Sequence, residues 1–161
     1  MVGSSKKHEP AYYLLICMDA VDSYDQKVFA SDIAKMRLRY NAWPLYKRTG
    51  HVGNLKHGDR CLVYLGGTGP NRQSFIGEGT VRAICSVPYD WADGDGSLIM
   101  DPAVKLVRFS NTKTWRKPVC IRSHIDYLRF IKNKKTWGVH LMGGTRRIPA
   151  ADYERICAAS K

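Results

Sequence analysis

The chain has 161 residues, of which 44% are hydrophobic and 11% aromatic, and it carries a formal net charge of +12. This length and composition suffice for one domain with a buried core and exclude wholesale disorder, while the strong positive charge favours a polyanionic partner. We expect residues 1–10 to form a flexible N-terminal lead and residues 11–161 to form a single domain.

The N-terminal part of the chain predicts one strand and one helix. Residues 11–19 are continuously apolar and rich in aromatic and β-branched types, as in a buried strand. Ser23 or Asp25 is placed to cap a helix that runs to Met36, with apolar side chains along one face. The following residues, 38–56, are aromatic and basic without clear periodicity, and we expect a loop there.

The central part of the chain is typical of a curved sheet. We expect strands at residues 60–65, 74–84 and 104–109, the last of them half-exposed because apolar and basic residues alternate along it. Glycines inside the strand at 74–84 indicate a bulge or a close backbone approach, which suits a sheet that curls. The glycine-rich residues 66–71 and the acidic residues 90–96 are expected to form loops.

Shorter elements are predicted in the C-terminal part. We expect strands at residues 119–121 and 139–141, a brief helix capped by Ser123, and a final helix that begins near Pro149. Short curved strands with a few helices between them favour an α+β fold. The prediction is a small curved β-barrel with helices packed around it.

The positive charge is concentrated in the last 60 residues. Residues 1–101 hold 12 Lys and Arg against 11 Asp and Glu, whereas residues 102–161 hold 14 against 3. Clustered cations of this kind gain free energy by releasing counterions from phosphate groups. We therefore expect nucleic acid as the partner. A membrane is not expected, because the apolar run at residues 12–18 is far too short to span a bilayer.

One segment, residues 40–49, mixes aromatic rings with cations and contains Trp43, Tyr46, Lys47 and Arg48. Bases stack on flat apolar rings and phosphate groups bind nearby cations, so the segment is suited to nucleic acid. The alternative interpretation is that Trp43 and Tyr46 plug one end of the barrel as core residues.

A second segment, residues 130–138, repeats this chemistry within the strongly basic part of the chain. Here Lys132, Lys134 and Lys135 precede Trp137. The alternative interpretation is a solvated turn followed by a core tryptophan. Two such segments in one chain favour contact with nucleic acid.

No pattern of catalytic or metal-binding residues stands out in the sequence. The histidines are scattered, the five cysteines form no CxxC pair, and no GxSxG, HExxH or phosphate-binding loop is present. We expect no metal and no cofactor, and we assign no catalytic residue. Widely spaced free cysteines are typical of a reducing compartment, and we expect a cytoplasmic protein.

Four stretches together resemble the EVE domains, members of the PUA-like superfamily that also includes the YTH readers of methylated adenine. In chain order they are YYLLICMDA, WPLYKRTGHVGNLKHGDRCLVYLGG, SFIGEGTV and FIKNKKTWGVHLMGGTRRIPAADYERI. The resemblance covers residues 11–158 and implies a compact barrel whose aromatic pocket accepts a flipped or unpaired modified base, most often methylated. It favours DNA over RNA as the partner.

The resemblance is carried over only to matching positions. It implies a base pocket made of the aromatic residues Trp43, Tyr46, Tyr64 and Trp137. The cations expected to bind phosphate groups are Lys47, Arg48, Lys132, Lys134, Lys135, Arg146 and Arg147. EVE domains also occur joined to nuclease modules, so any cleavage would need a nuclease partner in another chain or module.

Two other functions stay open on the sequence. One is a PUA-like RNA-binding or RNA-processing enzyme, which would need a catalytic set that we do not find in the sequence. The other is a protein-interaction domain that binds an acidic partner through the same aromatic and basic residues.

Overall fold

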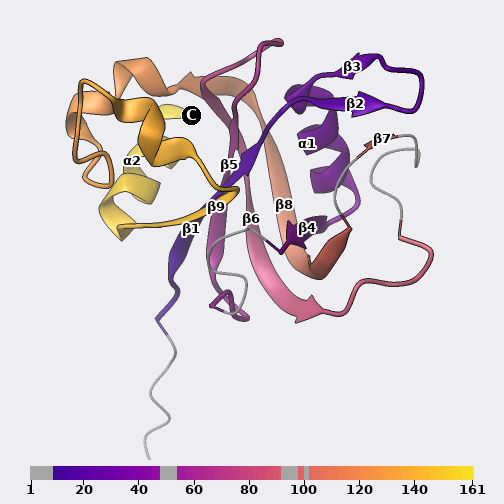
Figure 1. Cartoon of the computed structure of the whole chain (residues 1–161). Helices are drawn as coiled ribbons and strands as arrows, with labels where there is room; N and C mark the ends of the chain where they lie inside the picture. Colours follow the sequence, from indigo (N-terminus) through magenta and orange to yellow (C-terminus); the bar gives the residue numbers. More distant parts are fainter. Residues whose placement is uncertain (1–8, 48–53, 92–97, 100–101) are drawn as a thin grey trace, which may run out of the picture.

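A curled sheet of six strands forms the centre of the structure, a computed structural model that describes residues 9–47, 54–91, 98–99 and 102–161 (Figure 1). In order across the sheet, the strands are β4 (Ala42–Tyr46), β8 (Ala103–Cys120), β6 (Ser74–Cys85), β5 (Arg60–Leu65), β1 (Tyr12–Cys17) and β9 (Thr145–Ile148). A smaller sheet has the order β3 (Lys27–Val28), β2 (Ala20–Asp22) and β7 (Leu98–Ile99). The helices are α1 (Ala30–Arg39), α2 (Ala150–Ala159) and the short 3-10 helices η1 (Ile121–Ser123), η2 (Ile125–Tyr127) and η3 (Trp137–Leu141). The predicted α+β fold with a small curved sheet is confirmed.

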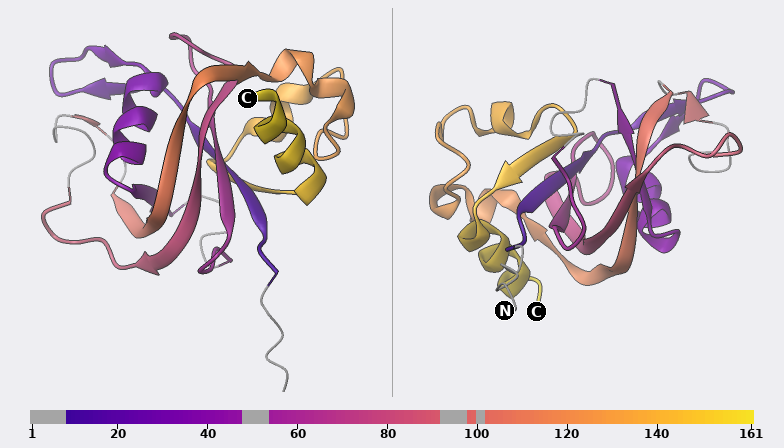
Figure 2. Two further views of the ribbon diagram at one scale, coloured as in Figure 1. Left: turned by 180° about the vertical axis from the view of Figure 1, so that it is seen from behind. Right: turned by 90° about the horizontal axis from the view of Figure 1, so that it is seen from below.

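Both faces of the six-stranded sheet are covered, because its central strands are apolar on both sides. Along β1, Tyr13 and Leu15 face a core that includes α1, whereas Leu14 and Ile16 face a second core that includes α2. Figure 2 shows the two helices on opposite sides of the sheet. β1 pairs with β5 in parallel and with β9 in antiparallel orientation, which confirms the buried strand expected at residues 11–19.

The longest strands, β6 and β8, bend by means of bulges. Their pairing changes register between Phe75 and Gly77 and again around Val81. A side chain at Gly77 would collide with the carbonyl oxygen of Lys113, so the close approach of the two backbones requires glycine at this position. The bulge or close approach expected from the strand glycines is confirmed.

Two element predictions in the C-terminal part are wrong. β8 is continuous, so the strands expected at residues 104–109 and 119–121 are the two ends of one strand that pairs with β6 between them. Residues 139–141 belong to η3 rather than to a strand. The N–H group of Val139 bonds locally to the carbonyl of Thr136 (3.1 Å), which is a helical turn rather than a ladder contact.

Some expectations fall on residues that are not described. The lead expected at residues 1–10 lies outside the described residues except for Glu9 and Pro10, and the loop expected at 90–96 does so from residue 92 onward. Among the described residues, no helix is both long and apolar enough to cross a membrane.

One carboxylate fixes the start of α1 and the glycine-rich loop after β5. Asp19 accepts a hydrogen bond from the N–H of Ala30 (2.9 Å) and two from the N–H and hydroxyl of Thr68 (both 2.9 Å). The helix therefore begins at Ala30, and residues 23–25, expected to cap it, form the turn between β2 and β3. Burial raises the pKa of the Asp19 carboxyl, but the hydrogen bonds outweigh burial and hold that pKa below its ordinary value.

We expect Asp19→Asn to lower the free energy of unfolding by about 1–2 kcal/mol, because a neutral amide replaces the charged acceptor of three hydrogen bonds. The folded pKa lies below the unfolded value of about 3.9, so the carboxylate stabilises the fold fully above that value and loses its contribution as the pH falls through the folded pKa. Urea unfolding of both proteins from about pH 3 to pH 7 tests this. A stability difference that did not shrink at acidic pH would contradict it.

Candidate nucleic-acid interface

A tryptophan, an arginine and a tyrosine meet beside the edge strand β4. The guanidinium carbon of Arg37, on α1, lies 4.8 Å from the ring centroid of Trp43, on β4. The same guanidinium donates a hydrogen bond to the hydroxyl of Tyr46 (3.3 Å). Trp43 and Arg37 are buried, Tyr46 is half-buried and Lys47 is exposed, so the group runs from the core to the surface within a few residues. We call Arg37, Trp43 and Tyr46 the Trp43 cluster.

The loop expected at residues 38–56 contains strand β4 instead. This strand holds Trp43 and Tyr46 in place. β4 lies at the edge of the sheet and pairs with β8 alone in the sheet order, which is where a strand tolerates Pro44. A bulge between Leu45 and Tyr46 interrupts the pairing. Bulges commonly re-aim a side chain, and the Tyr46 hydroxyl here reaches Arg37 on the helix.

The other two aromatic residues predicted for the pocket lie in the second core. Tyr64 is buried on β5 and contacts Phe75 edge to face, with ring centroids 5.2 Å apart. Trp137, on η3, packs against the same core and has the guanidinium of Arg122 at 5.6 Å from its ring. Burial raises the pKa of Tyr64 to about 12. The sheet therefore separates Tyr64 and Trp137 from the Trp43 cluster, and the four do not line one pocket.

The predicted phosphate-binding lysines of the turn before η3 differ in what their ammonium groups contact. Lys132 and Lys135 are exposed in the turn before η3. The ammonium group of Lys134 instead donates a hydrogen bond to the carbonyl of Leu128 at 2.7 Å, which ties this turn to the body of the domain. Lys132 and Lys135 are therefore better placed than Lys134 to contact an external anion.

The remaining predicted phosphate-binding cations also differ in their exposure. Arg147 is exposed on β9, whereas Arg146 is half-buried with its guanidinium 5.7 Å from the ring of Phe130. Lys47 is exposed at the end of β4, and Arg48 lies outside the described residues.

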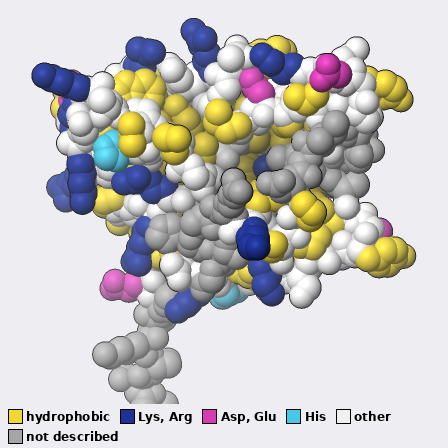
Figure 3. All heavy atoms as spheres, viewed as in Figure 1, with side chains coloured by type: hydrophobic (Ala, Val, Ile, Leu, Met, Phe, Trp, Pro, Cys, Tyr) yellow, Lys and Arg dark blue, Asp and Glu magenta, His cyan; other side chains and the backbone are white. Residues whose placement is uncertain are grey.

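The cations of the strongly basic part of the chain lie mostly at the surface. Of its 14 Lys and Arg residues, 12 are exposed and two are half-buried. Figure 3 shows many of the Lys and Arg side chains over the C-terminal segments on the left, while the side formed by β2 and β3 carries fewer. Within the described ranges, no group of three or more His, Cys, Asp or Glu side chains could hold a metal ion.

Sequence reasoning missed Arg37. The residue lies on the same face of α1 as Ile33 and Ala34, which are buried in the core. An arginine within the apolar stripe of a helix is itself a signal, because a buried guanidinium needs a partner. The helix predicted from the sequence ends at Met36, one residue before Arg37, so the predicted apolar face does not include this signal.

No protein-family model matches the sequence. The UPF0310 protein PH1033 of Pyrococcus horikoshii is 29% identical over 133 residues, which cover 73% of this chain and 85% of that protein.

Solved structures of similar fold include two that cover nearly all of this chain. The ASCH structure from Zymomonas mobilis has a TM-score of 0.55 at 10% identity and covers 95% of this chain and 98% of its own. The YTH domain of the MRB1 protein of Zygosaccharomyces rouxii, solved in complex with N6-methyladenosine RNA, has a TM-score of 0.54 at 13% identity and covers 100% and 94%. At these identities the likeness shows the fold: the chain has the same overall fold as these ASCH and YTH structures.

We expect Tyr46→Phe to lower the free energy of unfolding by about 1–3 kcal/mol, because it removes a hydrogen-bond acceptor from a buried, charged guanidinium. Urea unfolding of the variant and the wild type measures this difference. Tyr24→Phe is the matched control, since the Tyr24 side chain is 81% exposed. Equal stability of Tyr46→Phe and the wild type would show that the hydrogen bond to Arg37 contributes nothing.

Proposed function

We propose that the chain is a nucleic-acid reader of the EVE type, which holds a methylated base against Trp43 and performs no chemistry on it. The observation that carries the proposal is the Trp43 cluster. It places a large flat ring, a planar cation and a phenol together at the end of an edge strand that leads to exposed Lys47. Flat rings and guanidinium planes are the groups on which proteins stack unpaired bases.

The charge distribution supports a polynucleotide as the ligand. The exposed cations of residues 102–161 provide affinity for phosphate groups that does not depend on sequence. Phosphate contacts of this kind position the strand, and the base pocket supplies the selectivity.

The shared fold supports a methylated base as the ligand. A YTH domain with the same architecture was solved with N6-methyladenosine RNA. Under our proposal, this chain uses the fold for a base with an added methyl group. The preference for DNA rests on the resemblance to EVE domains alone, so RNA ligands belong in the same test.

Because Trp43 is only 2% exposed, a base reaches its ring only when the groups that cover it move. Arg37 lies over the ring, and we infer that its guanidinium gives up this place to the base. Stacking on an aromatic ring contributes about 1–3 kcal/mol per base, whereas extracting a base from a duplex costs a few kcal/mol. An unpaired base is therefore the favoured ligand.

We expect tighter binding to one methylated base than to its unmodified form. A panel of single- and double-stranded DNA and RNA oligonucleotides with methylated or hydroxymethylated cytosine, methylated adenine or no modification measures this. With four to six phosphate contacts, the slope of log K against log salt should be about −3 to −5. A slope near zero, or equal affinity for every modified and unmodified strand, would overturn the proposal.

We expect Trp43→Ala to weaken binding of the preferred methylated strand by about 1–3 kcal/mol, because the base loses its stacking partner. Thermal unfolding of the same protein is needed, since truncating a buried tryptophan costs about 3–5 kcal/mol of stability. Trp43→Phe and Trp115→Phe form a gentler matched pair, because Trp115 is also buried but lies in the second core. Loss of discrimination in both variants, or in neither, would place the base elsewhere.

We expect the double change Lys132→Gln and Lys135→Gln to weaken binding of methylated and unmodified strands alike and to make the salt slope shallower by about 1–2. These side chains are exposed and should contact the backbone rather than the base. If the double variant lost only the preference for the methylated base, the lysines would have a different role.

A further inference from the structure

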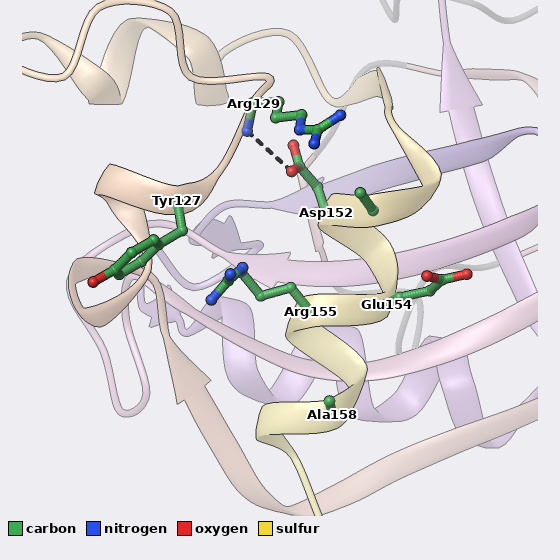
Figure 4. A pocket seen from close by; sticks show the side chains of 7 residues that line it. Tyr127, Arg129, Asp152, Glu154, Arg155 and Ala158 are labelled. Atoms are coloured by element: carbon green, nitrogen blue, oxygen red, sulfur yellow. Dashed lines mark hydrogen bonds between the residues drawn. The ribbon is translucent and has the colours of Figure 1, made fainter.

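A hollow lies on the α2 side of the sheet, away from the Trp43 cluster. It has a volume of about 550 Å³ and is bordered by η2, the segment after it, and α2. Tyr127, Arg129 and Arg155 supply its large side chains (Figure 4). None of these residues was singled out by the sequence, and none belongs to the proposed base pocket.

The hollow holds one guanidinium in a fixed place. The guanidinium carbon of Arg155 lies 4.7 Å from the ring centroid of Tyr127, and Figure 4 shows the Arg155 side chain directed toward Tyr127. The Tyr127 side chain is 62% exposed and Arg155 is exposed, so the pair lies at the surface. A guanidinium stacked on a ring keeps its fork of N–H donors for an anion and loses less conformational freedom on binding.

The two acidic residues of the hollow, Asp152 and Glu154, do not neutralise the positive charge of the Arg155 guanidinium. Asp152 is 1% exposed, and its carboxylate accepts hydrogen bonds from the backbone N–H groups of Arg129 (3.0 Å) and Phe130 (2.9 Å). These bonds fix the segment that carries Arg129 against α2. Glu154 points away from the Tyr127–Arg155 pair, on the other side of the helix (Figure 4).

The positive charge of Arg155 also acts on the neighbouring His124. Burial lowers the pKa of His124, and the positive charge of Arg155 lowers it further. A cation at the surface with this reach attracts an anion, and planar guanidinium forks match phosphate oxygens in geometry.

We propose that Arg129 and Arg155, with Tyr127 positioning Arg155, form a phosphate-binding site for the backbone of the bound nucleic acid, on the opposite side of the sheet from the base pocket. This inference rests on the proposed function. It adds two arginines to the exposed lysines before η3, so that the backbone contacts on the α2 side include a guanidinium held in place by an aromatic ring.

The test uses the whole chain and a short single-stranded DNA, with and without one N6-methyladenine. We expect the double change Arg129→Gln and Arg155→Gln to make the slope of log K against log salt shallower by about 1.4, which corresponds to two phosphate contacts on a single strand. Discrimination between the two strands should stay the same. Glutamine at position 129 leaves its backbone N–H free to bond to Asp152, and thermal unfolding checks that each variant folds.

The matched control is the double change Lys56→Gln and Arg82→Gln, which removes two exposed positive charges outside the hollow. Its salt slope should stay close to that of the wild type. Tyr127→Ala should lose part of the effect of Arg155, and Tyr127→Phe should restore it, since the ring and not the hydroxyl holds the guanidinium.

The outcomes separate this inference from the proposed function. If the wild type binds and discriminates but the Arg129 and Arg155 variant behaves like the control, only the second site is overturned. A wild-type chain that binds none of the DNA strands would overturn both. Equal slopes for Tyr127→Ala and Tyr127→Phe would refute the positioning role of the ring.

Discussion

The burial of both faces of the six-stranded sheet is the constraint on which the rest of the structure depends. Within it, strands β1 and β5 pair in parallel and place apolar side chains alternately in two cores. A sheet of this kind must carry cover on each side. Helix α1 covers one face, and the 3-10 helices with α2 cover the other, so the molecule has two distinct surfaces on which ligands can bind.

Three aspartates accept backbone hydrogen bonds from other segments of the chain. Asp19 bonds the first N–H of α1, Asp59 bonds the N–H groups of Ala11 and Lys56, and Asp152 bonds the segment before η3 to α2. Carboxylates used in this way contribute to folding and are largely removed from the surface: Asp59 and Asp152 are each 1% exposed. The positive charge of residues 102–161 lies at the surface, since 12 of their 14 Lys and Arg residues are exposed and the same segment holds only 3 Asp and Glu residues.

The strongest sequence patterns predicted the central strands, because β1, β5 and much of β6 are decided by local composition. The failures depend on distant contacts. The start of α1 is set by Asp19, which lies 11 residues before Ala30, and β4 forms despite Pro44 because β8 supplies its partner. The division of the predicted pocket residues follows from which face of the sheet each side chain occupies. That face depends on strand register, which no short motif reveals.

The central claim is that the base binds on the α1 side of the sheet, against Trp43. The indole N–H resonances of Trp43, Trp91, Trp115 and Trp137, followed by NMR during titration with a strand that contains the preferred methylated base, test it directly. The account predicts a large shift of the Trp43 resonance and little change for Trp115, whose indole N–H is bonded to Glu78 (3.1 Å) on the other side of the sheet. An unmoved Trp43 resonance, with a large shift of Trp137 instead, would place the base on the α2 side and contradict the account.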